Sequence, residues 1–411
     1  MKIALFWSDP HPKKGGGSNY QTQILKGILK LSPKSRHTFV FFTTNNEIPD
    51  YLLASGIEIV RLHRSTAEKI ESKITRVAHA GLRKLREPLK PFAIDGWYND
   101  HVLSLIERNR VDLILSLSPY FQPVDYPYIM PLWDLVHRLH PYFPEVSSNG
   151  AWEGRDRMYF NSLGRASVIV AGTEVGKADI VRSYHIVPDR IKVIPFATPE
   201  LKLNPTIDTA SVAKKYNLPE DYLFYPAHFW PHKNHVGLLL AMSHLKERFR
   251  IEVPLVCVGA DKGNQAYVQQ TAHDLGLSAQ VHFLGFCPEE DLARLYQRAF
   301  SLTYMSFSGP DNLPPLEAMA LGCPVIAANV LGAAEQLGDA ALLVDQKKPE
   351  EIARAIMQLK SDPGLRQGLV ERGKVRASRW TTEDYVREVF SIIDDFEAVR
   401  RCWRGPDQSF V

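Results

Sequence analysis

Three junctions between an expected strand and an expected helix contain residue types that bind anionic or polyhydroxylated ligands. In the first, residues 13–18, three consecutive glycines precede a helical pattern. Glycines allow a backbone to approach a ligand closely, and a helix N-terminus offers unpaired N–H groups and a positive dipole end. This junction therefore suits a phosphate group, and a flexible loop with Ser18 as N-cap explains it equally well. Gly-x-Gly-x-x-Gly is absent, so a dinucleotide fingerprint is not indicated.

The second junction, residues 225–235, places a lysine at the start of a helix. Lys233 stands just before Asn234, a residue type typical of a helix N-cap, and an apolar helix is expected over residues 236–248. The positive end of the helix dipole disfavours a lysine at this position unless an anion lies between them. Lys233 is therefore predicted to bind an anion, and the alternative is a solvated lysine on a loop.

The third junction, residues 308–326, predicts a short helix that carries a carboxylate. Asn312 is expected as its N-cap, prolines occupy the first turn, and Gly322 ends the helix. Glu317 lies one turn into this helix, on a different face from the apolar residues. Because an ionised glutamate has only acceptors, it could bind both hydroxyls of a ribose diol. The alternative is a glutamate that faces solvent.

The elements that must position these residues follow the α/β pattern, in which short apolar runs alternate with helical patterns. At roughly 150 residues per domain, 411 residues predict two or three domains. A linker is predicted over residues 195–211, where three prolines interrupt the periodicity. Strands are expected at residues 3–7, 38–43, 57–62, 113–117, 128–133, 167–171 and 191–194, and then at 222–227, 255–259, 281–284, 301–304, 325–328 and 341–344.

Composition excludes several classes of protein. The net charge of +3 is too small for a protein that coats nucleic acid. The four cysteines form no CxxC pair, which fits a reducing compartment. No stretch reaches the roughly 20 apolar residues of a membrane span, and the first apolar run is a strand rather than a signal peptide. A cytoplasmic protein is therefore expected.

Together and in this order, the junctions resemble those of the retaining glycosyltransferases of family 4, which have the GT-B architecture. The resemblance covers nearly the whole chain, and NLPPLEAMALGCPVIA is its most specific segment. It implies an α/β fold with two Rossmann-like parallel-sheet domains that face a central cleft. Residues 1–200 would bind the acceptor and residues 201–380 the nucleotide sugar. The C-terminal helix within residues 381–411, which begins near Trp380, would cross back to the first domain.

The resemblance also implies roles for individual residues. Lys233 and His228 would neutralise the donor diphosphate, and Glu317, the last residue of a Glu-x7-Glu motif, would bind the ribose. The donor-binding residues implied are Gly16, Gly17, His228, Lys233, Asn312, Leu313 and Glu317, and the catalytic residues implied are Lys233, Glu317, Asp134 and His137.

Three positions depart from the family pattern. Gly309 stands where the first Glu of the motif contacts the donor sugar, so sugar recognition is altered or lost. His228 stands where arginine is common, so its contact requires either a protonated ring or a neutral N–H donor. Trp133 replaces the histidine of the acceptor-side His-Asp motif, whereas Asp134 and His137 remain.

The implied reaction is transfer of a sugar, with retention, from a nucleotide sugar to a saccharide or lipid-linked acceptor. The sequences of these motifs are similar to those of mannosyl-type transferases that use GDP-sugars. Asp-x-Asp is absent, so neither a metal ion nor another cofactor is expected. A metal-free route would use Lys233, His228 and helix N-termini to stabilise the departing diphosphate. Two alternatives stay open, a GT-B nucleotide-sugar epimerase and a non-catalytic GT-B protein that binds a sugar or a partner.

One further segment is strongly basic. Residues 61–90 contain nine Lys and Arg residues against three Glu, with apolar residues at helical spacing. Such an amphipathic segment could lie on an anionic membrane, at its inner face, and would suit an anionic acceptor. The alternative is a helix that packs on the first sheet and exposes a solvated outer face.

Overall fold

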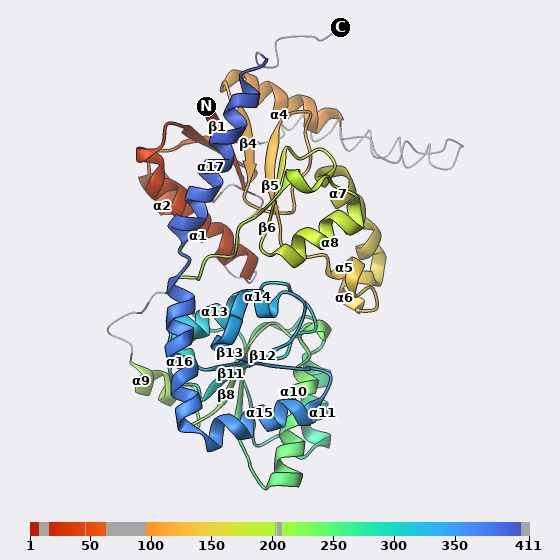
Figure 1. The fold of residues 1–411 in the computed structure, drawn as a ribbon, viewed down its shortest axis with the longest axis vertical. Helices are drawn as coiled ribbons and strands as arrows, with labels where there is room; N and C mark the ends of the chain where they lie inside the picture. The colour runs from red at the N-terminus through yellow and green to blue at the C-terminus, as the bar shows by residue number, and fades with distance from the viewer. Residues whose placement is uncertain (8–15, 46, 63–95, 202, 204–207, 404–411) are drawn as a thin grey trace, which may run out of the picture. The chain divides into compact units, whose positions relative to one another are not determined.

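The computed structural model describes residues 1–7, 16–45, 47–62, 96–201, 203 and 208–403 of the chain. The strands form two sheets, and β1 runs parallel to both of its neighbours in the first (Figure 1). That sheet has the order β3-β2-β1-β4-β5-β6-β7, where the strands are β1 (Lys2–Trp7), β2 (Thr38–Thr43), β3 (Glu58–Arg61), β4 (Leu113–Ser116), β5 (Tyr128–Leu132), β6 (Val168–Ala171) and β7 (Ile191–Val193). Because β4 and β5 are buried on both faces, they read in the sequence as continuous apolar runs.

The second sheet has the order β10-β9-β8-β11-β12-β13. Its strands are β8 (Leu223–Pro226), β9 (Leu255–Val258), β10 (Val281–Phe283), β11 (Ser301–Tyr304), β12 (Val325–Ala328) and β13 (Ala341–Val344). After β8, the chain forms β9 and β10 on one side of β8 and then returns to the other side at β11. Both β9 and β11 pair with β8 in parallel. The loops after β8 and β11 therefore leave the same edge at a switch point, where open α/β sheets bind ligands.

The strand predictions are confirmed. Every expected strand is present, and its bounds differ by at most one residue at either end. Between β7 and the next helix, which begins at Thr209, the described residues have no regular structure, and the linker over residues 195–211 stays a prediction.

The helices predicted over residues 236–248 and within residues 308–326, and the C-terminal helix, are also present. The helices are α1 (Gly16–Leu31), α2 (Asp50–Ala54), α4 (Gly96–Arg108), α5 (Val136–Leu139), α6 (Pro144–Ser147), α7 (Ala151–Leu163), α8 (Glu174–Tyr184), α9 (Thr209–Lys215), α10 (His235–His244), α11 (Gln265–Asp274), α12 (Glu289–Arg298), α13 (Leu313–Ala320), α14 (Ala333–Leu337), α15 (Pro349–Ser361), α16 (Pro363–Ser378) and α17 (Thr382–Arg400). Around the second sheet, α10 packs on α15 and α13 packs on α16.

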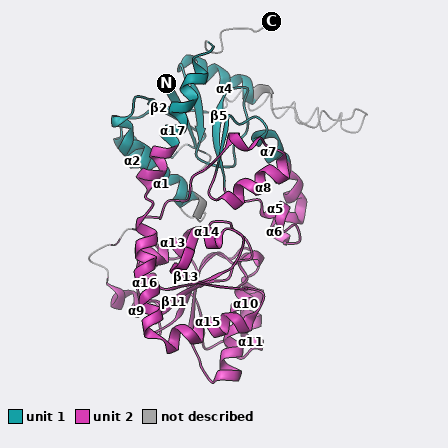
Figure 2. Cartoon of the chain, viewed as in Figure 1, with its two compact units in different colours: residues 1–132, 157–170, 389–411 teal, residues 133–156, 171–388 magenta. Residues whose placement is uncertain are grey.

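The chain divides into two compact units, which Figure 2 shows in different colours. The first comprises residues 1–132, 157–170 and 389–411, and the second comprises residues 133–156 and 171–388. The predicted domain boundaries at residues 200 and 380 stay a prediction.

The last helix, α17, returns to the first sheet as the fold class implied. Arg36 donates to Asp394 Oδ1 over 2.6 Å, and His37 Nε2 lies 2.8 Å from the same oxygen. Phe390 stacks on Phe39 of β2, with ring centroids 5.2 Å apart. These contacts fix the C-terminal half of α17 on the unit that contains the N-terminal strands.

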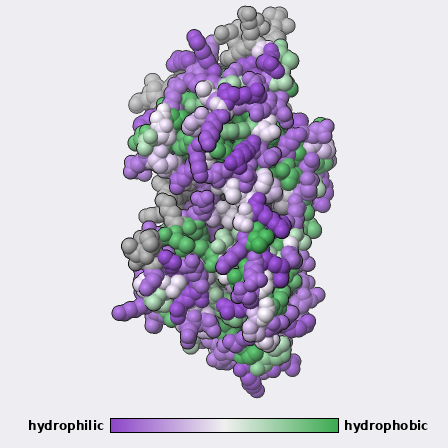
Figure 3. All heavy atoms as spheres, turned by 60° about the vertical axis from the view of Figure 1, so that its left-hand side comes forward, coloured by the Kyte–Doolittle hydropathy of each residue, from purple (hydrophilic) through white to green (hydrophobic). Residues whose placement is uncertain are grey.

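On the face drawn in Figure 3, hydrophilic side chains predominate and hydrophobic ones form scattered groups. Among the helices of the described residues, none combines the length and the apolar character that a membrane crossing needs. Of the basic segment 61–90, residues 63–90 lie outside the described residues.

Candidate functional site

Lys233 lies in the loop that follows β8, at the switch point of the second sheet. Its Nζ stands 5.4 Å from the centroid of the Tyr304 ring, at the end of β11, and no carboxylate of the described residues pairs with it. Tyr225 of β8 fixes this loop, because its hydroxyl donates to the Lys233 carbonyl and accepts from Met305 N–H over 3.1 Å. The backbone of Lys233 is thus held by β8, and its cation lies over the ring at the end of β11.

A second contact fixes the same loop and was missed from the sequence. Glu145 Oε1 accepts the backbone N–H of His232 over 3.0 Å and lies 2.6 Å from its Nδ1. The carbonyl of His232 in turn accepts Phe307 N–H over 2.8 Å. Glu145 and the loop after β11 therefore both position the residue next to Lys233.

Asn234 caps α10 as predicted. It has φ 53°, its Oδ1 accepts Gly237 N–H over 3.1 Å, and its Nδ2 donates to Gln346 O over 3.0 Å. A Cβ at residue 237 would overlap the Asn234 side chain, so the glycine provides the space for this cap. Lys233 consequently stands directly before a helix N-terminus, where the dipole favours an anion.

His228 is a neutral hydrogen-bond donor at the same edge of the sheet. Its Nδ1 accepts Ala260 N–H over 2.9 Å, so the ring proton is on Nε2. Burial lowers the pKa of His228, and the charges of Lys262 and Lys233 lower it further. Nε2 has no hydrogen-bond partner among the described residues. Of the two states that the sequence left open, the structure favours the neutral N–H donor.

Glu317 is buried in α13 and does not face solvent; only 8% of it is exposed. Its Oε2 accepts the Tyr296 hydroxyl over 2.6 Å. Burial raises the pKa of Glu317 to about 7, although the Tyr296 hydrogen bond acts in the opposite direction. The carboxyl group can therefore change protonation state near neutral pH.

The backbone at the start of α13 is held by a side chain of α14. Asn312 N–H donates to Gln336 Oε1 and its carbonyl accepts from Gln336 Nε2, both over 2.9 Å. Asn312 stands at the N-cap position, but its side chain makes no cap hydrogen bond and instead donates to Gly309 O over 2.9 Å. Asn312 is therefore the N-cap residue as predicted, but without the side-chain hydrogen bond that usually accompanies this position. Leu313 is the first residue of α13.

The backbone conformation at residue 309 explains why a glycine stands there. Its φ is 116°, a conformation that residues with a side chain rarely adopt, and a Cβ there would overlap the Asn312 side chain. The glutamate of the family motif therefore does not fit this loop as it stands.

Asp134 and Arg155 form a second polar group, at the end of β5 and in α7. Asp134 Oδ1 accepts from Arg155 Nη2 over 2.6 Å and from Val136 N–H over 3.0 Å. Burial acts to raise the pKa of Asp134, but Arg155 and this N–H outweigh it and hold the pKa below its ordinary value. Asp134 is therefore a carboxylate whose position Arg155 fixes.

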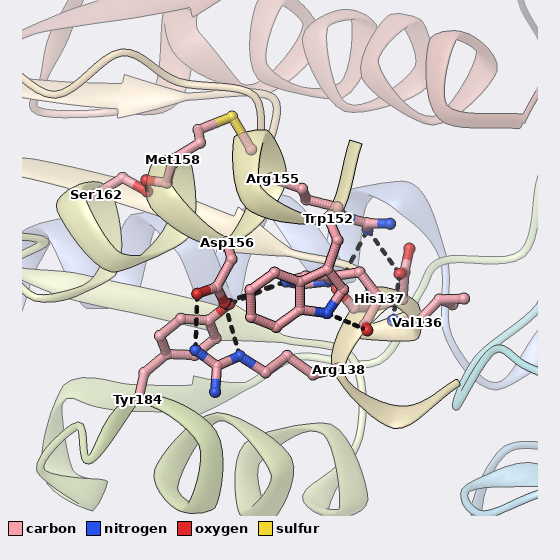
Figure 4. Close-up of polar contacts among 10 residues, drawn as sticks. Val136, His137, Arg138, Trp152, Arg155, Asp156, Met158, Ser162 and Tyr184 are labelled. Atoms are coloured by element: carbon pink, nitrogen blue, oxygen red, sulfur yellow. Dashed lines mark hydrogen bonds and ion pairs between the residues drawn. The ribbon is translucent and has the colours of Figure 1, made fainter. Parts of the chain in front are cut away.

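His137, on α5, is fully buried in a network that Figure 4 shows. Its Nε2 lies 3.1 Å from the Tyr184 hydroxyl and 3.5 Å from Asp156 Oδ1. Arg138 binds Asp156 with two hydrogen bonds of 2.6 and 2.9 Å. Burial lowers the pKa of His137 to about 4, and Arg155 contributes in the same direction. His137 is therefore a neutral ring at pH 7.

The structure thus brings together Lys233, His228 and the start of α10, and separately Asp134 with Arg155. Gly16 and Gly17 begin α1 and belong to the first unit, so their predicted contact with donor phosphates stays a prediction. Among the described residues, the one group whose geometry could hold a metal is His37, Asp394 and Glu397, at the contact of α17 with the first unit.

Residues 207–376, which contain the second sheet, match the family model "Glycosyl transferases group 1". The chain is 29% identical to O-antigen chain mannosyltransferase B of Escherichia coli over 63% of this chain and 72% of that protein. The family match and this relative indicate a glycosyltransferase enzyme. A D-inositol 3-phosphate glycosyltransferase of Streptomyces bingchenggensis is 30% identical to this chain, over 53% of this chain and 50% of that protein.

The fold of this glycosyltransferase is also similar to that of solved structures. The Anabaena protein HepE, crystallised with UDP and glucose, superposes with a TM-score of 0.68 over 96% of this chain and 100% of its own, at 17% identity. The predicted GT-B fold class and the prediction of an enzyme are confirmed. Membership of family 4 stays a prediction.

Proposed function

We propose that this glycosyltransferase transfers a sugar, with retention, from a nucleotide-sugar donor to a saccharide or lipid-linked acceptor in polysaccharide or glycoconjugate synthesis. One observation carries the proposal. Lys233 has no described carboxylate partner, precedes the N-terminus of α10, and lies close enough to His228 for its charge to lower the pKa of that ring.

These groups suit the diphosphate of a nucleotide sugar. Charge accumulates on the diphosphate as the bond to the sugar breaks, and donors that are already oriented toward it lower the barrier most effectively. Lys233 supplies a full charge, the Nε2–H of His228 supplies a neutral hydrogen bond, and α10 supplies its dipole. In the proposed reaction these groups replace a metal ion.

Glu317 would bind the ribose of the donor. Because Oε2 already accepts the Tyr296 hydroxyl, a ribose hydroxyl would bind through Oε1. The ionised form accepts hydrogen bonds from a diol more strongly than the neutral acid, since hydrogen bonds to charged groups are the stronger ones.

In a retaining front-face reaction, the acceptor hydroxyl attacks the anomeric carbon on the side that the diphosphate leaves. The acceptor's proton passes to the leaving phosphate oxygen, so no protein nucleophile is required. Asp134, held by Arg155, would orient the acceptor hydroxyl. His137 lies in the network next to it and would keep α5 in place.

The name of the Escherichia coli relative, an O-antigen chain mannosyltransferase, supports a mannosyl donor and a polysaccharide acceptor. We favour a GDP-sugar for this reason and because of the motif wording. The complex of HepE with UDP and glucose supports a nucleoside diphosphate in a fold of this kind.

The proposal is tested by a melting-temperature screen with GDP-mannose, UDP-glucose and a dTDP-sugar. A ligand at 100 times its Kd stabilises a protein by about 2.7 kcal/mol, which is readily measured. A donor that stabilises the protein is then incubated with lipid-linked and free saccharide acceptors, with and without EDTA, and the anomeric configuration of the product is read by NMR. Failure of every nucleotide sugar to bind would refute the proposal. Epimerised donor without acceptor, or binding without turnover, would favour the two alternatives.

A further inference from the structure

Asp311 is a buried carboxyl group without a partner in the described part of the chain. Only 8% of it is exposed, and neither side-chain oxygen accepts a hydrogen bond from another described residue. Leaving a buried polar group unpaired costs about 1–3 kcal/mol, and more when the group is charged. Native structures keep few such groups, and each requires an explanation.

The loop around Asp311 is tightly built. Gln336 holds the backbone of the next residue through two hydrogen bonds. A Cβ at Gly332 would overlap Pro310, which precedes Asp311, and Gly332 has φ 92°. A Cβ at Gly172, directly after β6, would overlap the Asp311 carboxyl group itself. Glycines at two separate positions thus accommodate this loop and its carboxyl group.

The surroundings of Asp311 carry negative charge. Burial raises the pKa of Asp311 well above its ordinary value, and Asp134 and Glu335 contribute in the same direction. Glu335 itself accepts Glu174 N–H, at the start of α8, over 2.8 Å. An anionic ligand would be repelled here, whereas hydroxyl groups, which donate hydrogen bonds, would satisfy the unpaired oxygens.

We propose that Asp311 is a specificity-determining residue whose carboxyl oxygens bind hydroxyl groups of the transferred sugar. The inference rests on the proposed function, in which Lys233 and His228 bind the diphosphate and Glu317 the ribose. The sugar is the uncharged, hydroxyl-rich part of the donor that those residues leave without a partner. The carboxylate absent at Gly309 is then supplied from two residues further along the same loop.

The test compares a nucleoside diphosphate with its sugar conjugate. Dissociation constants for GDP and GDP-mannose, and for UDP and UDP-glucose, are measured by calorimetry for the wild type, for Asp311→Asn and for Asp274→Asn. Asp274 is an exposed residue of α11 and serves as the control. In Asp311→Asn, the Kd of the preferred nucleoside diphosphate should change less than about twofold, while its sugar conjugate should lose its additional affinity, about tenfold or more.

A second measurement identifies the hydroxyl. Deoxy analogues of the sugar conjugate should bind the wild type about tenfold more weakly when the hydroxyl that contacts Asp311 is removed, and should bind Asp311→Asn no more weakly than the intact conjugate. Equal affinity of wild type and Asp311→Asn for the sugar conjugate would overturn the inference, as would sugar binding that EDTA abolishes.

The two hypotheses fail differently. If the wild type binds neither nucleoside diphosphate nor nucleotide sugar, the proposed function is wrong. If it binds both and Asp311→Asn does so equally well, only the role of Asp311 is wrong. Loss of nucleoside diphosphate binding together with a lowered melting temperature in Asp311→Asn would show a structural role and would also overturn the inference.

Discussion

Replacing Lys233 by methionine removes the cation from the proposed diphosphate site and keeps most of the side-chain volume over the Tyr304 ring. Removing one oriented group that stabilises transition-state charge costs about 100- to 1,000-fold in kcat, or roughly 3–4 kcal/mol. We expect Lys233→Met to show a loss of kcat in this range in a donor-turnover assay. The change in kcat should be larger than the change in the KM for the acceptor.

The same substitution should not destabilise the fold. Lys233 precedes the N-terminus of α10, has no carboxylate partner among the described residues, and is therefore disfavoured by the helix dipole. Its removal should leave the free energy of unfolding unchanged or raise it by about 0.3–1 kcal/mol, measured by urea denaturation.

Lys246→Met is the matched control, because Lys246 follows the same helix and pairs with Glu252 at the surface over 3.0 Å. It should keep wild-type turnover. Lys233→Met with kcat/KM within about threefold of wild type, or with a stability loss as large as its activity loss, would refute the assignment of Lys233 to the diphosphate.

Three further predictions follow from burial and charge. The folded-state pKa of Glu317, about 7, lies above its ordinary value, so its burial destabilises the fold increasingly as pH rises from 4.5 to 7. Glu317→Gln should therefore become more stable than the wild type over that range, by on the order of 3 kcal/mol at pH 8. A difference in the free energy of unfolding that urea titrations show to be independent of pH would contradict this. The pKa of His137, about 4, lies below its ordinary value, so its contribution is complete above pH 6.5 and is lost as pH falls toward 4; the melting temperature of His137→Gln should depend less steeply on pH in this window. Liposomes that contain anionic lipid should bind the protein in a salt-sensitive manner through residues 61–90, and flotation that is unchanged when the basic residues of this segment are replaced would exclude membrane contact through this segment.

The strands could be predicted because buried parallel strands are short apolar runs between helical patterns, and this pattern is local in sequence. The cap at Asn234 was predictable for the same reason, since the N–H that its side chain accepts lies three residues away, in Gly237. The missing cap hydrogen bond of the Asn312 side chain could not be predicted in this way. Gln336 of α14, which is 24 residues away, holds the backbone of Asn312, and the side chain donates to Gly309 O instead.

The remaining site residues depend on contacts between distant segments. Asp156 joins Arg138 and Tyr184, and nothing in the sequence near any of them indicates the other two. Asp311 stands in a Gly-Pro-Asp-Asn turn, where an aspartate is ordinarily solvated, so its burial depends on Gly172. Sequence reasoning singled out Lys233, which we propose binds the diphosphate, and missed the buried carboxyl group of Asp311.

A side chain at residue 172 would overlap Asp311, so the residue types at these two distant positions depend on one another. While the Asp311 carboxyl group keeps its position, residue 172 can only be glycine. In descendants that lose the acid, position 172 becomes free to accept alanine or serine. Paired change at these two sites across natural variants would therefore record a shift in the sugar that the lineage transfers.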